Sequence, residues 1–234
     1  MNPKTKEFID SVLRLSPKTA VFDCDGTLWA PDAGEGFLSW ELQRGLLPDQ
    51  AARSIRARYA EYKEGKVEED VMCGEMVTIH AGLSEKQIEE ATETYFSTAV
   101  EPGIFPEMRQ LVKDLAQEGC EVWAVSSSNQ WVINAGMRRF GIPPDHVLAV
   151  AVEIDQGRIT DRLLRIPSGK GKADALRATV DGQVDAAFGN TRWDTEMLEL
   201  ARHPFAINPS TDFEQLARKR EWPIYFPDST VISR

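Results

Sequence analysis

Cysteine and histidine are scarce in this chain. The three cysteines, Cys24, Cys73 and Cys120, are widely spaced and include no Cys-x-x-Cys pair. The sequence therefore predicts neither a disulfide framework nor a zinc site. The three histidines are scattered without metal-ligand spacing, so each is interpreted as structural. This cysteine usage fits a reducing compartment, and we expect a cytoplasmic protein.

Positive charge and long apolar runs are also lacking. The formal net charge of -10 at pH 7 disfavours a general nucleic-acid binder, which usually needs a basic face. No segment approaches the length of a membrane-spanning helix, and the first residues lack the apolar run of a signal peptide. We expect a soluble, unprocessed monomer or homodimer without nucleic-acid or membrane partners. An anionic substrate would then be met by locally placed donors and a cation.

The hydrophobic pattern divides the 234 residues into two kinds of segment. Residues 19–23 form a compact apolar run before the breaker Asp25-Gly26-Thr27, which predicts a buried strand. From about 34 to 100 the apolar residues recur at helical spacing, which predicts an all-helical insertion. Helical and strand patterns then alternate. Such alternation is typical of parallel strands joined by helical crossovers.

The predicted fold class is α/β, with a Rossmann-like parallel sheet core and an inserted helical cap after the first strand. We expect helices at 4–15, 106–117, 130–140, from about 172, 194–201 and 213–220, and further strands at 121–126, 147–154, 184–188 and 205–207. Gln156-Gly157 lies between β-prone residues and predicts a short hairpin. The core would comprise residues 1–30 and 102–234, and the cap residues 31–101.

Polar residues follow several of the predicted strands. Asp23 and Asp25 follow the first strand, Ser126 ends the second, and Asn190 follows a later one. Lys172 opens a helix between the last two. In open parallel sheets, ligands bind outside the carboxyl ends of the strands. We therefore expect a nucleophile, a cation, a hydroxyl and metal ligands to converge there.

These residue types suit phosphoryl transfer, which needs an in-line nucleophile and stabilisation of negative charge. Asp23 is placed to attack phosphorus and form an aspartyl-phosphate. Asp25 would protonate the leaving alkoxide and then take a proton from the hydrolytic water. Gly26 would let the turn bring backbone amides near the phosphate. Thr27 and Ser127 are further candidates for substrate binding.

A magnesium ion would complete this chemistry. Mg²⁺ prefers an octahedron of hard oxygen ligands, with few protein groups and the rest water and phosphate. Asp23, a carbonyl at Asp25, and Asn190 or Asp194 are the candidate ligands. The sequence therefore predicts Mg²⁺ as the cofactor.

Four segments resemble the signatures of the haloacid-dehalogenase-like hydrolases. Val-Phe-Asp-Cys-Asp-Gly-Thr at 21–27 resembles the first signature, and Val-Trp-Ala-Val-Ser at 122–126 the second. Lys172 in Gly-Lys-Gly-Lys-Ala matches the third, and Gly-Asn-Thr-Arg-Trp-Asp-Thr-Glu-Met-Leu at 189–198 the fourth. With the helical insertion after the first motif, the order and spacing are most similar to the phosphoserine-phosphatase-like branch.

The resemblance implies a magnesium-dependent phosphatase acting on a small phosphorylated metabolite, either phosphoserine-like or a phosphorylated amino alcohol. It implies that Asp23 is the nucleophile and Asp25 the acid/base, that Ser126 and Lys172 hold phosphate, and that the fourth motif binds metal. Lys172 is preferred to Lys170 because it directly precedes the apolar-periodic helix. The alternatives are a binding or regulatory pseudoenzyme and a phosphotransferase or mutase.

Two positions depart from the family pattern. Asn190 stands where these phosphatases usually carry Asp, so an oxygen ligand is kept but a charge is lost. This predicts weaker metal affinity, or compensation by Asp194. Trp193 stands where phosphoserine phosphatases commonly carry an Asn that contacts substrate, which argues against phosphoserine itself.

Substrate selection is expected from the cap and the loop that leads into it. Asp32 and Glu35 lie where the resembling phosphatases carry an acidic residue that meets the substrate's amino group. Either would then recognise a cationic head group. The alternative is that both residues simply begin a helix, where carboxylates are favourable. Three arginines, Arg53, Arg56 and Arg58, are candidates for binding a carboxylate, but we interpret them as a solvated helix face. Three tryptophans, Trp29, Trp40 and Trp193, are candidates for a cage around a quaternary ammonium, but we interpret them mainly as packing residues. Trp193 is also kept as a candidate for substrate binding.

Overall fold

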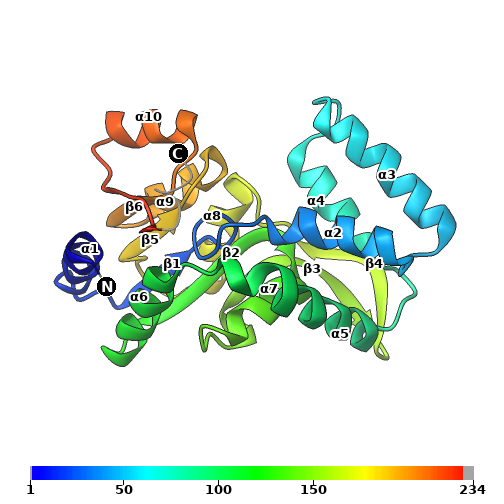
Figure 1. Ribbon diagram of the computed structural model, residues 1–234, viewed down its shortest axis with the longest axis horizontal. Coiled ribbons are helices and arrows are strands. Elements are labelled where there is room, and N and C mark those ends of the chain that lie inside the picture. The colour runs from blue at the N-terminus through cyan, green and yellow to red at the C-terminus, as the bar shows by residue number, and fades with distance from the viewer. Residues whose placement is uncertain (1, 229–234) are drawn as a thin grey trace.

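The computed structural model describes residues 2–228, which are organised around one seven-stranded sheet (Figure 1). The strand order is β4-β3-β2-β1-β5-β6-β7, and every neighbouring pair is parallel except β3 with β4. The strands are β1 (Thr19–Phe22), β2 (Glu121–Asn129), β3 (Val147–Asp155), β4 (Arg158–Arg165), β5 (Ala186–Gly189), β6 (His203–Ile207) and β7 (Ile224–Tyr225). The expected α/β fold is confirmed, and the expected hairpin supplies the antiparallel edge strand.

The central strands contribute apolar residues to both faces of the sheet, because helices cover both faces. Phe22 and Ala124 belong to one hydrophobic cluster, whereas Val21 and Val125 belong to another. Successive side chains point to opposite faces, so these two clusters are the two faces of the core. The first cluster includes residues of α1 (Pro3–Leu13), α6 (Pro106–Gln117) and α7 (Gln130–Arg138), and the second includes residues of α8 (Lys170–Thr179), α9 (Thr195–Leu200) and α10 (Thr211–Lys219).

The segment between β1 and α6 is helical. It contains α2 (Ala33–Arg44), α3 (Asp49–Lys63), α4 (Glu69–Thr78) and α5 (Glu85–Tyr95), followed by a π-helical turn at Phe96–Val100 and a 3-10 turn at Glu101–Gly103. The helices α3 and α4 lie on the β3–β4 side of the sheet, far from α1 and β6 (Figure 1). Leu38, Ile55 and Met72 form a small apolar core between α2, α3 and α4. This core holds the outer helices together.

Some boundaries differ from those expected. β2 continues past Ser126 to Asn129, although its pairing with β3 shifts register after Val125. α8 begins at Lys170, and the two-residue strand β7 was not predicted because so short a segment shows no alternation. Within residues 2–228, no helix has both the length and the apolar character needed to cross a bilayer.

A buried polar pair ties α2 to the end of α4. The His80 Nε2 atom lies 2.8 Å from Glu41 Oε2, and its Nδ1 atom lies 3.1 Å from the Val77 carbonyl oxygen. A carbonyl only accepts, so Nδ1 carries a proton, and one further proton is shared between Nε2 and the carboxyl. Both side chains are fully enclosed, with the imidazole against Phe37 and Trp131.

Replacing Glu41 with Ala should lower the free energy of unfolding by about 3–5 kcal/mol, because one member of a buried polar pair loses its partner. Urea unfolding followed by circular dichroism measures this change. The exposed Glu89 on α5, replaced in the same way, should change stability by less than about 0.5 kcal/mol. Equal effects of the two substitutions would show that the pair does not stabilise the fold.

Candidate active site

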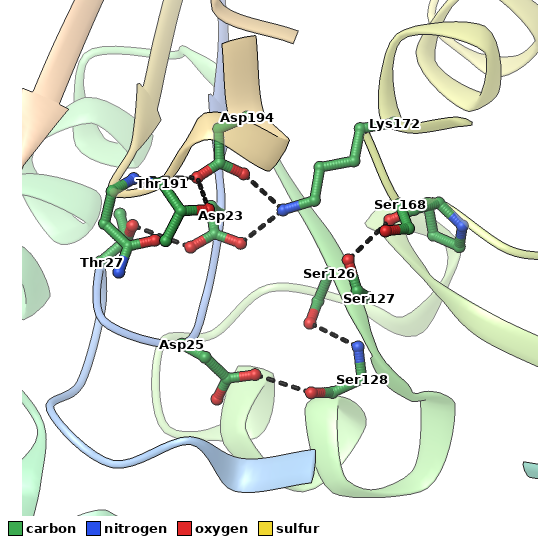
Figure 2. Close-up of polar contacts among 12 residues, drawn as sticks. Asp23, Asp25, Thr27, Ser126, Ser127, Ser128, Ser168, Lys172, Thr191 and Asp194 are labelled. Carbon is green, nitrogen blue, oxygen red and sulfur yellow. Dashed lines mark hydrogen bonds and ion pairs between the residues drawn. The ribbon is translucent and has the colours of Figure 1, made fainter. Parts of the chain in front are cut away.

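Asp23 is the first residue after β1 and lies at the floor of the site (Figure 2). It is only 5% exposed. Its Oδ1 atom accepts a hydrogen bond from Lys172 Nζ at 2.6 Å, and its Oδ2 atom accepts one from the Thr27 hydroxyl at 2.8 Å. Burial and the nearby Asp194 raise the pKa of Asp23 to about 6, although Lys172 and Thr27 oppose the shift. Both carboxylate oxygens are thus fixed in place by donors.

Lys172 lies in the first turn of α8 and is 2% exposed. Its ammonium group lies between two carboxylates, at 2.6 Å from Asp23 Oδ1 and 2.6 Å from Asp194 Oδ1 (Figure 2). Burial opposes the charge, but Asp194 and Asp23 outweigh it and raise the pKa of Lys172. The ammonium therefore stays charged. Lys170, by contrast, is exposed and lies 4.0 Å from Asp174.

Asp194 is fully buried and does not line the cavity above Asp23. Its Oδ2 atom accepts hydrogen bonds from the backbone amides of Asn190 and Thr191, at 2.9 and 3.0 Å. Its Oδ1 atom accepts from Lys172. These contacts hold the loop after β5 in a capped turn and orient Lys172. Asn190, Thr191 and Trp193 of this loop line the cavity, whereas Asp194 does not.

Asp25 lies on the other side of the cavity from Lys172 (Figure 2). Its Oδ1 atom accepts from Trp29 Nε1 at 2.7 Å and from the Ala33 amide at 2.8 Å, and its Oδ2 atom accepts from the Ser128 hydroxyl at 2.7 Å. Burial, followed by the nearby Asp32, raises the pKa of Asp25 to about 7. A carboxyl with a pKa near neutrality is suited to both donating and accepting a proton.

The end of β2 supplies hydroxyl and amide groups to the same cavity. The register shift after Val125 frees Ser126, Ser127 and Ser128 from the regular ladder. Ser126 is buried, and its Oγ atom accepts from the Ser128 amide at 3.1 Å. The Ser127 hydroxyl donates to the Pro167 carbonyl at 3.2 Å, which fixes the loop before α8. All three serines line the cavity.

A single cavity of about 280 Å³ connects these groups. It brings together nine of the residues predicted from the sequence, namely Asp23, Asp25, Asp32, Glu35, Ser126, Ser127, Lys172, Asn190 and Trp193. The structure places Gly26, Thr27 and Asp194 behind this lining. Asp32 also caps α2, where its Oδ1 atom accepts from the Glu35 amide at 2.8 Å. The helix-start role proposed for Asp32 is thus observed, and both acids also line the cavity.

The outer wall of the cavity was largely missed from the sequence. It comes from α3 and α4 through Tyr59, Tyr62, Lys63, Glu69, Met72, Cys73 and Met76. The tyrosines and methionines appeared only as part of the apolar helical pattern, and nothing in that pattern marks a residue that faces a cavity. Tyr62 and Glu69 are linked by a hydrogen bond of 3.1 Å.

The other sequence candidates lie away from this cavity. Arg58 forms ion pairs with Glu61 and Glu75 on the outer helices, while Arg53 and Arg56 are exposed, as expected of a solvated helix face. Trp29 is fully buried and Trp40 packs against Phe37, whereas Trp193 lines the cavity. The three histidines, His80, His146 and His203, do not line it either.

The donor set around Asp23 suits a hard cation. Asp23 and Asn190 offer side-chain oxygens at the cavity floor, and Asn190 lies directly over Gly26. A Cβ atom on Gly26 would lie 1.8 Å from Asn190 Nδ2. The Asn190 side chain therefore fits only because residue 26 is a glycine. Among residues 2–228, no group of three or more His, Cys, Asp or Glu side chains is arranged to hold a metal. Mg²⁺ needs few protein ligands, so this set fits it.

Comparison with known proteins places this site in a family. A profile of the haloacid dehalogenase-like hydrolases matches residues 20–199. A histidinol-phosphatase of Neisseria meningitidis is 26% identical over 88% of this chain and 96% of its own length. A protein of Mycobacterium tuberculosis named as a probable phosphatase is 25% identical over 88% of this chain and 74% of its own length.

Solved structures show the same fold. A Bordetella pertussis protein of unknown function superposes with a TM-score of 0.78 at 22% identity, covering 88% of this chain and 97% of that one. A phosphoserine phosphatase captured as an analogue of its phospho-aspartyl intermediate gives a TM-score of 0.59 at 18% identity, covering 91% and 94% of the two chains. The profile match spans the four motifs and the site they form. The chain belongs to the haloacid dehalogenase-like hydrolase family.

Proposed function

We propose that this chain is a Mg²⁺-dependent phosphomonoesterase that transfers the phosphoryl group of a small phosphorylated metabolite to Asp23 and then to water. The observation that carries the proposal is the juxtaposition of Asp23, Lys172 and Asp25 around one cavity. The phosphatase names of the Neisseria and Mycobacterium relatives support it.

In the first step, an oxygen of Asp23 bonds to phosphorus while the bond from phosphorus to the ester oxygen breaks. The Lys172 ammonium, 2.6 Å from Asp23 Oδ1, keeps the carboxylate ionised and offsets the charge of the phosphate. The leaving alkoxide takes a proton from Asp25. Because the pKa of Asp25 is raised to about 7, a substantial fraction of this carboxyl is protonated near neutral pH.

In the second step, the Asp25 carboxylate takes a proton from water as the water oxygen bonds to phosphorus. The bond between phosphorus and Asp23 then breaks, inorganic phosphate leaves, and Asp25 is again protonated. The hydrogen bonds from Trp29 and Ser128 hold the Asp25 carboxyl in one orientation through both transfers. We propose that Ser126, which lines the cavity, binds the phosphate through its hydroxyl and backbone.

We propose Asp23, the Asp25 carbonyl and Asn190 as the residues that hold Mg²⁺. When bound, the ion would supply positive charge to the phosphate oxygens. Asp194 has its oxygens committed to Lys172 and to the loop amides, so it acts through the orientation of Lys172.

Replacing Asn190 with Asp should tighten Mg²⁺ binding by about tenfold, because a charged ligand replaces a neutral one. Isothermal titration of the protein with MgCl₂ measures this without any substrate. The corresponding change from amide to carboxylate at the exposed Gln87 on α5, Gln87→Glu, should leave the affinity as it is. An unchanged affinity in Asn190→Asp would remove Asn190 from the ligand set.

We further propose that residues 31–101 act as a cap that selects the substrate, while 1–30 and 102–234 carry the chemistry. The outer wall of the cavity, with Tyr59, Tyr62 and Glu69, supports this division.

The test is hydrolysis of a panel of phosphomonoesters, namely p-nitrophenyl phosphate, phosphoserine, phosphoethanolamine, phosphocholine, histidinol phosphate and sugar phosphates. Each ester is assayed with Mg²⁺ and then with excess chelator. We expect phosphate release that requires the metal. Hydrolysis that chelator leaves unchanged would contradict the metal dependence, and an absence of hydrolysis across the panel would contradict the phosphatase activity.

A further inference from the structure

Glu69 lies in the first turn of α4 and forms part of the outer wall of the cavity. Its Oε2 atom accepts a hydrogen bond from the Tyr62 hydroxyl at 3.1 Å, and its Oε1 atom accepts one from the Ser168 hydroxyl at 3.3 Å. Ser168 belongs to the loop before α8, close to Lys172 in sequence. Glu69 thus connects the outer helices to the loop that precedes α8, the helix that carries Lys172, and its carboxylate is fixed at both oxygens.

Glu69 forms no direct ion pair among residues 2–228, although Lys172 and Arg192 act on its charge from farther away. No Lys, Arg or His nitrogen forms an ion pair with it, whereas the nearby Glu35 pairs with Lys63 at 3.0 Å. Burial raises the pKa of Glu69, which reflects the cost of placing its charge in this half-buried position. A half-buried carboxylate is stabilised when a cation binds beside it.

The charged side chains that line the cavity carry an excess of negative charge. Five carboxylates but two ammonium groups line it, namely Asp23, Asp25, Asp32, Glu35 and Glu69 against Lys63 and Lys172. Lys172 is committed to the floor, where the phosphate would bind, and Lys63 is paired with Glu35. A second negative group on the substrate would therefore meet Glu69 without compensation. A positive group would neutralise it.

Aromatic rings frame the same end of the cavity. Tyr59, Tyr62 and Trp193 line it together with Glu69. The Lys63 ammonium lies 5.1 Å from the centre of the Tyr59 ring, and the Arg192 guanidinium lies 4.6 Å from the Trp193 ring. Ring faces attract cations, but these rings are already engaged by Lys63 and Arg192 of this chain, so the preference for a cationic head group rests on Glu69.

We propose that Glu69 receives a protonated nitrogen of the substrate, so that the site selects phosphomonoesters with a cationic amine or imidazole head group. The inference rests on the phosphatase activity proposed above and specifies its substrate class. An ester that also carries a carboxylate, such as phosphoserine, is disfavoured by the same charge balance. Glu69 is therefore a specificity-determining residue contributed by α4.

The test compares matched esters in the wild-type protein and in Glu69→Gln. Phosphoethanolamine and histidinol phosphate carry a cationic head, and ethyl phosphate and phenyl phosphate are neutral counterparts. The wild type should favour the cationic esters in kcat/KM, and Glu69→Gln should reduce this preference by about 10- to 100-fold, mostly through KM. Gln keeps one acceptor oxygen for one of the two hydroxyls, and its NH2 group can donate to the other hydroxyl oxygen, so the charge is the main change.

Glu68→Gln is the matched control, because Glu68 is exposed, directly precedes α4 and does not line the cavity. It removes the same charge from the same helix end and should preserve the wild-type preference. A wild type that hydrolyses both classes of ester equally, or a Glu69→Gln variant that keeps the preference, would overturn the inference.

Binding of unreactive phosphonates gives a second measurement that needs no variant and no turnover. Calorimetry of the wild type should show 2-aminoethylphosphonate binding at least about tenfold more tightly than ethylphosphonate. Equal affinities would overturn the inference. If no ester is hydrolysed, the proposed activity is wrong, and the phosphonate pair still decides whether the cavity selects a cation.

Discussion

Replacing Asp23 with Asn should lower kcat by at least about four orders of magnitude, as removal of a covalent nucleophile does in other enzymes. An amide oxygen does not form the acyl-phosphate bond at a useful rate. The amide can still accept from Lys172 and meet Thr27, so the substitution conserves shape. Lys172 also keeps its ion pair with Asp194. The variant should therefore fold, and its loss of activity should reflect the chemistry alone.

Steady-state phosphate release with Mg²⁺ measures this effect, with circular dichroism confirming the fold. Asp185→Asn is a suitable control, because Asp185 accepts from the Lys18 and Thr19 amides at the opposite edge of the sheet. This control should retain activity within about threefold, as expected of a change remote from the chemistry. A folded Asp23→Asn protein with a kcat within tenfold of wild type would rule out Asp23 as the nucleophile.

Replacing Lys172 with Met should abolish turnover and lower the free energy of unfolding by about 3–5 kcal/mol. The ammonium group is the shared partner of Asp23 and Asp194, which are 5% and 0% exposed. Without it, two buried carboxylates face one another with no cation. The same change at the exposed Lys170 removes a distant surface contact and should cost less than about 0.5 kcal/mol. Urea unfolding in chelator compares the two variants.

The stability lost in Lys172→Met should depend on pH. The pKa of Asp23 is already raised from 3.8 to about 6, and Lys172 is among the groups that oppose this rise, so the variant raises it further. Between the unfolded and folded pKa values the folded state binds more protons, so stability falls as pH increases. The loss of unfolding free energy caused by Lys172→Met should therefore be smaller at pH 5 than at pH 8. A deficit that is constant or larger at pH 5 would contradict the predicted ion pairing.

The catalytic floor was predictable from the sequence because parallel strands end at one edge of the sheet. Asp23 follows β1, Ser126 lies at the register shift near the end of the neighbouring β2, and Asn190 follows β5 on the other side of β1. The order of the strands in the sheet is enough to predict that these residues lie close together. Lys172 joins them because α8 begins beside the same edge. Local patterns and one topological rule therefore suffice for this part of the site.

The outer wall was not predictable in the same way. Tyr62 and Glu69 lie on helices whose orientation depends on how α3 and α4 pack over the sheet, and helical periodicity marks only an apolar face. The role of Asp194 was likewise hidden, because its spacing within the motif does not reveal that its oxygens turn toward Lys172 and the loop amides. Both features depend on tertiary contacts.

The proposed transfer of phosphate to Asp23 is tested by trapping the phosphorylated protein. The wild-type protein is mixed with ³²P-labelled ester and Mg²⁺, quenched in acid within milliseconds, and digested to peptides. We expect label on the peptide that contains Asp23. Hydroxylamine should release this label, as it does from an acyl-phosphate, and the label should be absent from Asp23→Asn. Turnover without protein-bound label, or label on another residue, would contradict it.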